Sequence, residues 1–207
     1  MSDVKTTLIF DMDGTLVDSS VVISGAINHV RKNLGLAKMD REKIMYAVND
    51  IHTHSPSYFY EAEAFTDNHI TWFQEYYTDK HFKELRLYDG VKEMLEKLSH
   101  KYQLSLATNA YRLSALQSLG HLEIENYFDI ILCADEVSIS KPNPEMIVKI
   151  LEHFEVAPHK AIMIGDSLKD KEAATAAGVE TILVDWGFSD LEDACREVGE
   201  LEKLLGV

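Results

Sequence analysis

Short apolar runs, most of them followed directly by a polar residue or a glycine, recur along the chain and predict the buried strands of a sheet. These runs occupy residues 8–10, 104–107, 130–133, 161–164 and 181–184. Between them, apolar residues three or four positions apart predict helices, for example around Val91, Leu113 and Met146. Because strand and helix alternate, we expect an α/β fold with a doubly wound parallel sheet.

Local chemistry marks the ends of several predicted helices. Asn143 lies where a helix N-cap is expected, and Gly120 and Gly178 lie where helices are expected to end. Ser189 and Glu192 have the spacing of a capping box and predict the start of a final helix. The buried face of that helix is expected to carry Leu191, Cys195, Val198 and Leu205.

The stretch between the first and second strands differs from the rest, because helical patterns follow one another there without an intervening strand. This pattern predicts an all-helical insertion. We therefore expect an α/β core domain formed by residues 1–16 and 86–207 and a helical domain formed by residues 17–85. Asp89 is expected to cap the first helix after the insertion. The apolar positions of the insertion include Ile23, Ile27, Val30, Leu34, Ile44, Val48, Ile70, Phe73 and Tyr77.

Polar clusters follow three of the predicted strands. Asp11 and Asp13 leave the first strand together with a glycine, Thr108 and Asn109 follow the second, and Asp166 follows the fourth. In parallel sheets the carboxyl ends of the strands meet at one edge, where ligands bind. Carboxylates from two parts of the chain can share one hard cation, and hydroxyl, amide and ammonium groups can hold an anion. Two further side chains complete this set, Lys141 and Asp170.

Composition and charge limit the possible partners. Of 207 residues, 46% are hydrophobic and 27% charged, which is ordinary for a globular protein. The formal net charge of −15 opposes unspecific binding to nucleic acid and to anionic membranes. Cys133 and Cys195 are far apart and in no metal-ligand spacing, which favours a reducing compartment. Without a signal peptide or an apolar stretch long enough to span a bilayer, we expect a soluble cytoplasmic protein.

The polar clusters resemble, in type and order, the four motifs of the haloacid dehalogenase superfamily. The resemblance spans nearly the whole chain, and the helical insertion lies where that family carries a helical cap. It is nearest to the phosphoglycolate phosphatase-like branch, which implies hydrolysis of small phosphate monoesters with Mg2+. In this sequence the motifs read Asp11-Met12-Asp13-Gly14-Thr15, Thr108-Asn109, Lys141-Pro142 and Gly165-Asp166-Ser167 with Asp170.

The resemblance implies a role for each matching residue. Asp11 is expected to be the nucleophile that forms an aspartyl-phosphate, and Asp13 the general acid and base. Thr108, the backbone amide of Asn109 and Lys141 are expected to hold the phosphoryl oxygens. Mg2+ is expected at the side chain of Asp11, the backbone carbonyl of Asp13 and the side chains of Asp166 and Asp170.

Substrate selection is expected in the polar loop of residues 49–55, which carries His52 and His54. Two imidazoles without a third ligand do not indicate a transition-metal site. The aromatic residues of the insertion are expected to form its own core. The resemblance implies a small phosphorylated metabolite of the phosphoglycolate or sugar phosphate type as substrate. The loop lacks the glycine-containing motif that the resemblance associates with many phosphoglycolate phosphatases, so phosphoglycolate is not singled out within this class. The oligomeric state is expected to be monomer or homodimer.

Other readings of the motifs remain open. A phosphomutase resembling β-phosphoglucomutase would use the same two aspartates but return the phosphoryl group to a sugar hydroxyl. The chain can also be a catalytically silent binding protein on this fold, although every catalytic position is present. The helical insertion argues against an aspartate-phosphorylated signalling receiver. Asp13 argues against a dehalogenase and against a phosphonatase.

Overall fold

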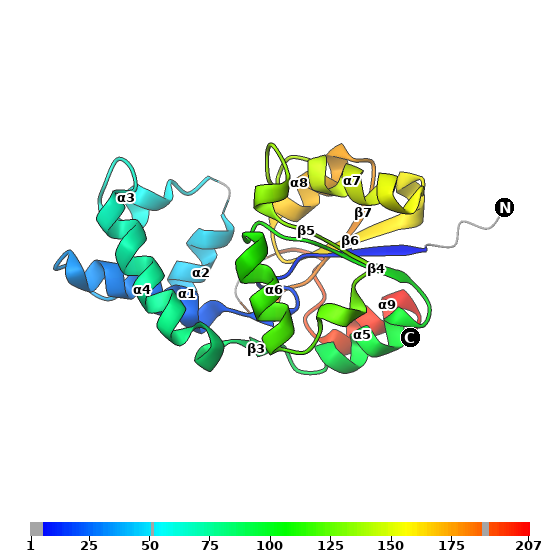
Figure 1. The fold of residues 1–207 in the computed structure, drawn as a ribbon, viewed down its shortest axis with the longest axis horizontal. Coiled ribbons are helices and arrows are strands. Elements are labelled where there is room, and N and C mark those ends of the chain that lie inside the picture. Colours follow the sequence, from blue (N-terminus) through cyan, green and yellow to red (C-terminus); the bar gives the residue numbers. More distant parts are fainter. Residues whose placement is uncertain (1–5, 51, 188–190) are drawn as a thin grey trace. The chain divides into compact units, whose positions relative to one another are not determined.

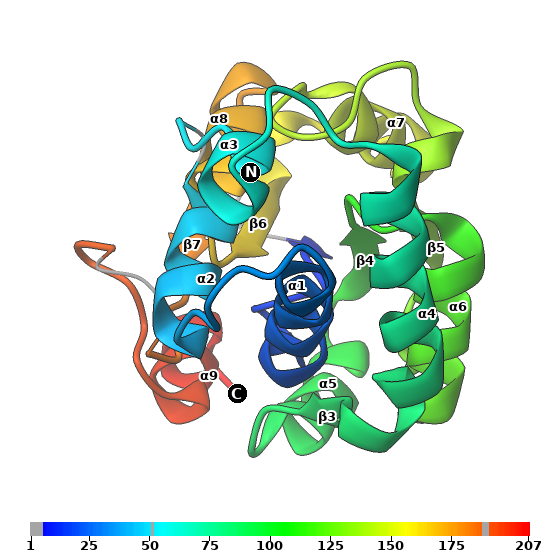
Figure 2. The same cartoon turned by 90° about the vertical axis from the view of Figure 1, so that its left-hand side faces the viewer.

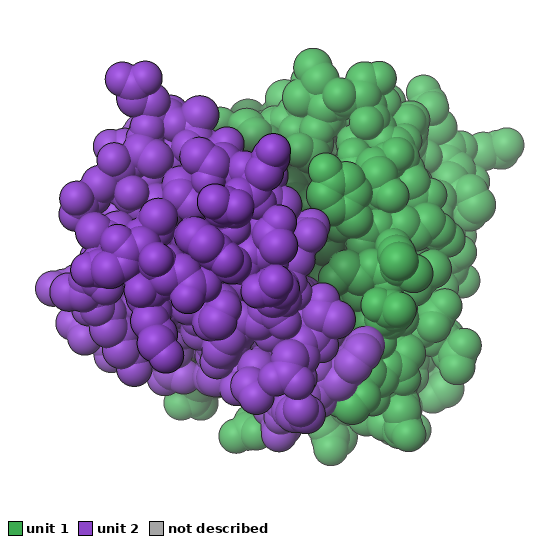
Figure 3. All heavy atoms as spheres, turned by 60° about the vertical axis from the view of Figure 1, so that its left-hand side comes forward, with its two compact units in different colours: residues 1–17, 87–207 green, residues 18–86 purple. Residues whose placement is uncertain are grey.

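The computed structural model describes residues 6–50, 52–187 and 191–207 (Figure 1). The chain divides into two compact units, which are coloured separately in Figure 3. Unit 1 comprises Met1–Val17 and Leu87–Val207, and unit 2 comprises Asp18–Arg86. No helix in the described part of the chain is long and apolar enough to cross a membrane.

Unit 1 is built on a five-stranded sheet in the order β5-β4-β1-β6-β7. All neighbouring strands pair in parallel, as the alternation of strand and helix predicts. In the central pairs Phe10 lies level with Leu106 and Ile164, so β1, β4 and β6 end near one another at the same edge. The strands are β1 (Thr7–Phe10), β4 (Gln103–Ala107), β5 (Ile130–Leu132), β6 (Ala161–Gly165) and β7 (Glu180–Leu183).

Helices cover both faces of this sheet, with α7 and α8 on one side and α5 and α9 on the other (Figure 1). Ile9 and Met163 of the sheet pack with Ile147 and Ile150 of α7 in one buried cluster. This burial is what the spacing of apolar residues in α7 predicts. The helices are α5 (Val91–Ser99), α6 (Arg112–His121), α7 (Glu145–Phe154), α8 (Leu168–Ala176) and α9 (Val198–Leu205), with 3-10 turns η1 (Glu125–Tyr127), η2 (Ala134–Glu136) and η3 (Pro158–Lys160).

Unit 2 is the predicted helical insertion (Figure 2). Its longest helices, α1 and α4, pack against each other, and Val22, Ala26 and Val30 of α1 are buried. The chain enters through β2 (Val17–Asp18) and leaves through β3 (Arg86–Leu87), which form a two-stranded sheet. The helices are α1 (Ser20–Asn33), α2 (Arg41–Asn49), α3 (Ser55–Tyr60) and α4 (Asp67–Glu84).

The predicted final helix is wrong at its start. Its described part begins only at Val198, and Cys195 forms a parallel bridge with Val184 instead of facing the core from a helix. Pairing with the end of β7 therefore overrides the local helix signal. Ser189 of the predicted capping box lies outside the described residues.

Four further helix ends can be compared with the predictions. Gly178, at φ +73°, follows α8 as predicted, whereas Gly120 lies inside α6. The cap position of α5 is taken by Gly90 at φ +85° and not by Asp89. The N-cap position of α7 is taken by Pro144 and not by Asn143, but the Asn143 side chain still accepts a hydrogen bond from the Glu145 N–H at 3.0 Å at the start of this helix.

Candidate active site

The three central strands carry the first candidate residues to one edge of the sheet. The Asp11 N–H donates to the Ile164 carbonyl at 2.9 Å, so the backbone stays in the ladder of the sheet as far as Asp11. The Thr108 N–H donates to the Leu132 carbonyl at 3.0 Å in the same way. Asp166 directly follows β6. Rigid strands therefore hold the backbones of these three residues.

Lys141 joins two buried carboxylates. Its Nζ donates to Asp11 Oδ1 at 2.5 Å and to Asp170 Oδ1 at 2.6 Å, and its side chain is only 2% exposed. The other oxygen of Asp170 accepts hydrogen bonds from the Ser167 N–H at 3.1 Å and the Ser167 hydroxyl at 2.7 Å. The start of α8 thus holds Asp170 as a capping residue, and Asp170 in turn orients the lysine ammonium.

The Asn109 side chain positions Lys141 from the other side. Its Oδ1 accepts from the Lys141 N–H at 3.0 Å, and its Nδ2 donates to the Lys141 carbonyl at 2.9 Å. The neighbouring Thr108 hydroxyl accepts from the Ala110 N–H at 3.0 Å. The Asn109 side chain therefore holds the backbone of the lysine, a role that the sequence pattern did not indicate.

Three carboxylates lie close enough to share a cation. Oxygens of Asp11, Asp166 and Asp170 all lie within 4.8 Å of one another, and all three residues are buried. Two glycines leave the space for them, because a Cβ at Gly14 would overlap the Asp166 carboxylate and one at Gly165 would overlap Asp170. Carboxylate oxygens are the ligands that Mg2+ prefers, so the donor set fits the predicted metal.

Burial and neighbouring charges shift the pKa values of the groups in this cluster. Burial raises the pKa of Asp11 to about 7, although Lys141 acts in the opposite direction. Burial, together with the charges of Asp11 and Asp170, also raises the pKa of Asp166 well above its ordinary value. Burial alone would lower the pKa of Lys141, but the two carboxylates outweigh it and raise this pKa. One ammonium faces three carboxylates, so a cation would relieve the excess negative charge.

Asp13 follows Asp11 by two residues and is half-buried. It forms an isolated bridge with Val17, and the Gly14 N–H donates to the Val17 carbonyl at 2.9 Å. Gly14 has φ +86°, a backbone conformation that a glycine adopts readily. The tight turn after β1 therefore places the two carboxylates of the first motif in different surroundings.

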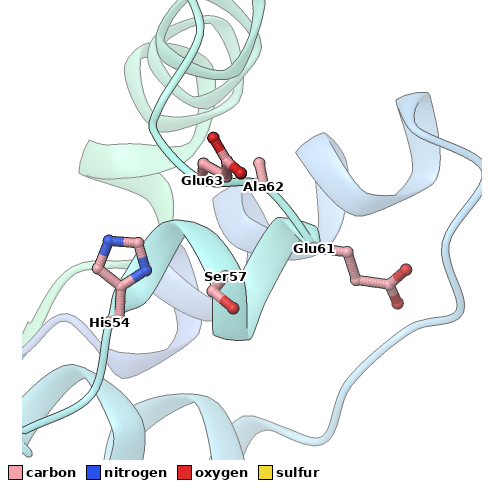
Figure 4. Close-up of a pocket in the computed structure, with 5 residues that line it drawn as sticks. All are labelled: His54, Ser57, Glu61, Ala62 and Glu63. Carbon is pink, nitrogen blue, oxygen red and sulfur yellow. The ribbon is translucent and has the colours of Figure 1, made fainter.

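His52 and His54 belong to the other unit, where both are exposed. The loop that carries them is shaped by Asp50, which accepts from the His52 N–H at 3.0 Å and the Thr53 hydroxyl at 2.7 Å. His54 precedes α3 and lines an open pocket in which the Glu61 side chain points away from the histidine (Figure 4). The full lining is His54, Ser57, Glu61, Ala62 and Glu63.

The structure thus brings Asp11, Asn109, Lys141 and Asp170 into one hydrogen-bonded network, with Asp166 beside it. Sequence reasoning did not assign a role to Ser167, although its spacing from the aspartate three residues later is that of a capping box.

The chain is similar to known hydrolases along most of its length. Residues 8–184 match the family of haloacid dehalogenase-like hydrolases. A phosphoglycolate phosphatase of Nitrosospira multiformis is 30% identical over 198 residues, covering 92% of this chain and 87% of that protein. A phosphorylated carbohydrates phosphatase of Thermotoga maritima is 32% identical over 180 residues, covering 84% of this chain and 82% of that protein.

A solved structure shows the same fold. It is a hydrolase of the haloacid dehalogenase-like family from Streptococcus pneumoniae, with a TM-score of 0.78 and 29% sequence identity. The alignment covers 93% of this chain and 90% of that one. With the parallel sheet, the helical cap region and the aspartate cluster in place, the chain belongs to the haloacid dehalogenase-like hydrolases and is a phosphatase of that family.

Proposed function

We propose that this phosphatase hydrolyses a small phosphate monoester, of the phosphoglycolate or sugar phosphate type, with Mg2+ and through an aspartyl-phosphate. The observation that carries the proposal is the buried cluster of Asp11, Asp166 and Asp170 around Lys141. A cation held there by these carboxylates and by the Asp13 carbonyl would neutralise charge between an anionic nucleophile and an anionic phosphate. The names of the two curated relatives support the substrate class.

The first half-reaction forms a bond between an Asp11 carboxylate oxygen and phosphorus. As this new bond forms, the bond between phosphorus and the ester oxygen breaks. Asp13 gives its proton to the departing alcohol oxygen. Asp11 suits this role because it is fixed at the end of β1 and its Oδ1 is held by Lys141. The products of this step are the free alcohol and the phosphorylated Asp11.

The second half-reaction releases phosphate. Asp13, now ionised, takes a proton from a water molecule whose oxygen attacks phosphorus, and the bond to Asp11 breaks. Inorganic phosphate leaves and both aspartates return to their starting states. Throughout, Lys141, the Thr108 hydroxyl and the Asn109 N–H would bind the phosphoryl oxygens, because phosphoryl transfer depends chiefly on positioning and charge stabilisation.

The test is a screen of the purified protein against phosphorylated metabolites with Mg2+. The panel should contain phosphoglycolate, several sugar phosphates and inorganic pyrophosphate, with p-nitrophenyl phosphate as a general substrate. We expect turnover of one or more monoesters that is lost in EDTA and restored by Mg2+. Transfer of the phosphoryl group to a sugar hydroxyl, without release of phosphate, would instead identify a mutase, and binding without turnover would identify a silent binding protein.

Asp11→Asn tests the nucleophile. The amide is not a competent nucleophile, so we expect no turnover and no phosphorylated protein in rapid-mix experiments, with an unchanged far-UV circular dichroism spectrum. Appreciable residual hydrolysis would contradict the assignment of Asp11.

Asp13→Asn tests the general acid and base, and its effect should differ from that of Asp11→Asn. The first step should survive on p-nitrophenyl phosphate, whose leaving group needs no proton, while the first step on an alkyl phosphate should slow by about 10²- to 10⁴-fold. Hydrolysis of an alkyl phosphate at the wild-type rate would show that Asp13 is not the acid.

A further inference from the structure

The segment that follows β7 reaches back to the turn that carries Asp13. The Trp186 indole N–H donates to the Thr15 carbonyl at 3.0 Å, a hydrogen bond between residues 171 positions apart. The Trp186 ring also contacts the ring of Tyr88, with 5.7 Å between the ring centroids. The Tyr88 N–H donates to the carbonyl of Leu16 at 3.2 Å. Two successive carbonyls of the turn are therefore held by residues from distant parts of unit 1.

Trp186 is itself fixed by the residues around it. The preceding Asp185 is buried, and its N–H donates to the Cys195 carbonyl at 2.9 Å. One Asp185 carboxylate oxygen accepts from the Gly187 N–H at 2.9 Å, and the other pairs with the Arg196 guanidinium. Trp186 therefore lies between two anchored neighbours, which limits the movement of its indole.

The two carboxylates of the first motif depend on different anchors. Asp11 is held by the strand ladder and by Lys141, as described above. Asp13 lies in the turn between that ladder and Thr15, where local backbone bonds, such as that from the Leu16 N–H to the Met12 carbonyl at 3.0 Å, shape the chain. The bond from Trp186 joins the far end of this turn to the body of the unit.

We propose that Trp186 is a positioning residue that acts through Asp13. By holding the Thr15 carbonyl, the indole fixes the turn so that the Asp13 carboxyl group meets the oxygen of the leaving group. This inference rests on the proposed function, because it requires Asp13 to be the general acid. It assigns a role to a residue after the fifth strand, where the sequence shows none of the motifs.

The test variant is Trp186→Phe, which removes the N–H donor and keeps an aromatic ring beside Tyr88. We expect the rate of alcohol release in the first turnover of an alkyl phosphate, measured by rapid mixing, to fall about tenfold, because small errors in the placement of a general acid are costly to proton transfer. On p-nitrophenyl phosphate we expect the rate of p-nitrophenol release in the first turnover to change by less than about twofold, since that leaving group departs without a proton and the later attack of water does not enter this rate. The ratio of the two rates is the measurement, and a general loss of folded protein would not change it.

Two controls make the ratio specific. Trp72→Phe makes the same substitution at the only other tryptophan of the sequence, in α4, and should leave the ratio unchanged. In the background of Asp13→Asn, the additional change Trp186→Phe should cause little further loss on the alkyl phosphate, because the two residues act as one unit. If Trp186→Phe does not fold, Arg196→Gln is the alternative variant. It removes the exposed guanidinium that pairs with Asp185, the residue before Trp186, and should lower the same ratio about threefold.

The outcomes separate this inference from the proposed function. If Asp13→Asn discriminates between the two substrates but neither Trp186→Phe nor Arg196→Gln does, the positioning role is wrong and the proposed function stands. Equal losses on both substrates in Trp186→Phe would also overturn the positioning role, since they indicate general damage. If Asp13→Asn itself does not discriminate, the acid is another residue, and both proposals are wrong.

Discussion

The ionisation of Asp11 decides when the candidate site can accept a cation. Burial raises the pKa of this carboxyl group to about 7, so in the metal-free protein it carries a proton over much of the acidic range. Mg2+ binds carboxylates and not carboxylic acids, and the cation must therefore displace that proton. Burial also raises the pKa of Asp166, so a proton competes with the cation at this carboxylate as well.

We therefore predict that the affinity for Mg2+ depends steeply on pH. It should weaken by at least about tenfold for each pH unit below 7 and change little well above 7. Calorimetric titration with Mg2+ at several pH values between 5.5 and 8.5 measures this. In Asp11→Asn the dependence should become shallower, because one of the titrating ligands is gone. An affinity that is constant across this range in the wild-type protein would contradict the raised pKa.

Gly165 is a second residue on which the cluster depends. A methyl group there would overlap the Cβ and carboxylate of Asp170, which Ser167 and Lys141 hold in place. Asp170 cannot move aside without breaking those bonds. We predict that Gly165→Ala lowers the free energy of unfolding by about 1–3 kcal/mol, as overpacking typically does, and removes most activity.

Gly199 offers a matched control for this substitution. A Cβ at that position would meet no heavy atom within 4 Å among the described residues. Gly199→Ala, which lies within α9, should therefore leave activity unchanged and slightly raise stability. Urea unfolding and the rate on p-nitrophenyl phosphate measure both effects, and an active, stable Gly165→Ala protein would show that the space is not needed.

At the scale of the element, the strands and most helices follow from the sequence because their signals are periodic. The five apolar runs correspond to the five parallel strands, and the apolar residues spaced around Met146 lie in α7. The start of the final helix was predicted wrongly because a capping box is a local signal, whereas the pairing of Cys195 with Val184 is a contact between separate segments. The short helix α3 was not predicted, since six residues are too few for a clear period.

The candidate site could also be predicted in part: the sequence indicates which residues meet, but not how their side chains bond. Strand ends and parallel pairing bring Asp11, Thr108 and Asp166 to one edge, and that much follows from polar residues placed after apolar runs. The hydrogen bonds of the Asn109 side chain to the Lys141 backbone, and of Trp186 to Thr15, depend on side-chain directions in the folded chain. No spacing in the sequence indicates such contacts, because the partners come from separate segments.

The packing of α1 against α4 in unit 2 requires a close approach of the two helices at Gly25. Atoms of the Tyr76 ring and hydroxyl lie 2.5–2.7 Å from where a Cβ of residue 25 would be, so the glycine in α1 lets α4 approach closely. In an exposed helix, glycine to alanine stabilises by about 0.5–1 kcal/mol. Here we predict that Gly25→Ala instead destabilises by about 1 kcal/mol, because the Tyr76 ring must move.

A double-mutant cycle tests this packing. In a Tyr76→Ala background the obstacle is gone, and Gly25→Ala should then stabilise the protein by about 0.5–1 kcal/mol, the ordinary helix-propensity gain. The change of sign, measured by urea unfolding, is the expected result. The same effect of Gly25→Ala in both backgrounds would mean that Tyr76 does not set the distance between the two helices.

For the whole molecule, chemistry and recognition are expected to belong to different units. The residues proposed to act on the phosphoryl group all lie in unit 1, and that group is the same in every phosphate monoester. The part of a substrate that differs is the leaving group. We expect unit 2 to recognise it, through the loop of residues 49–55, because a cap that closes over a site can both exclude water and contact the substrate.

This division of labour predicts a selective effect of His52 and His54. Replacing both by alanine should lower kcat/KM on the preferred metabolite by about tenfold or more and leave p-nitrophenyl phosphate within about twofold, because binding interactions with one leaving group are lost while the chemistry is kept. The paired substitution of His100 and His159, two exposed histidines of unit 1, should change neither rate. Equal losses on both substrates would show that the loop acts on the chemistry or on the fold. No loss on either would place recognition in another part of unit 2, and the open pocket beside α3 is then the next region to vary.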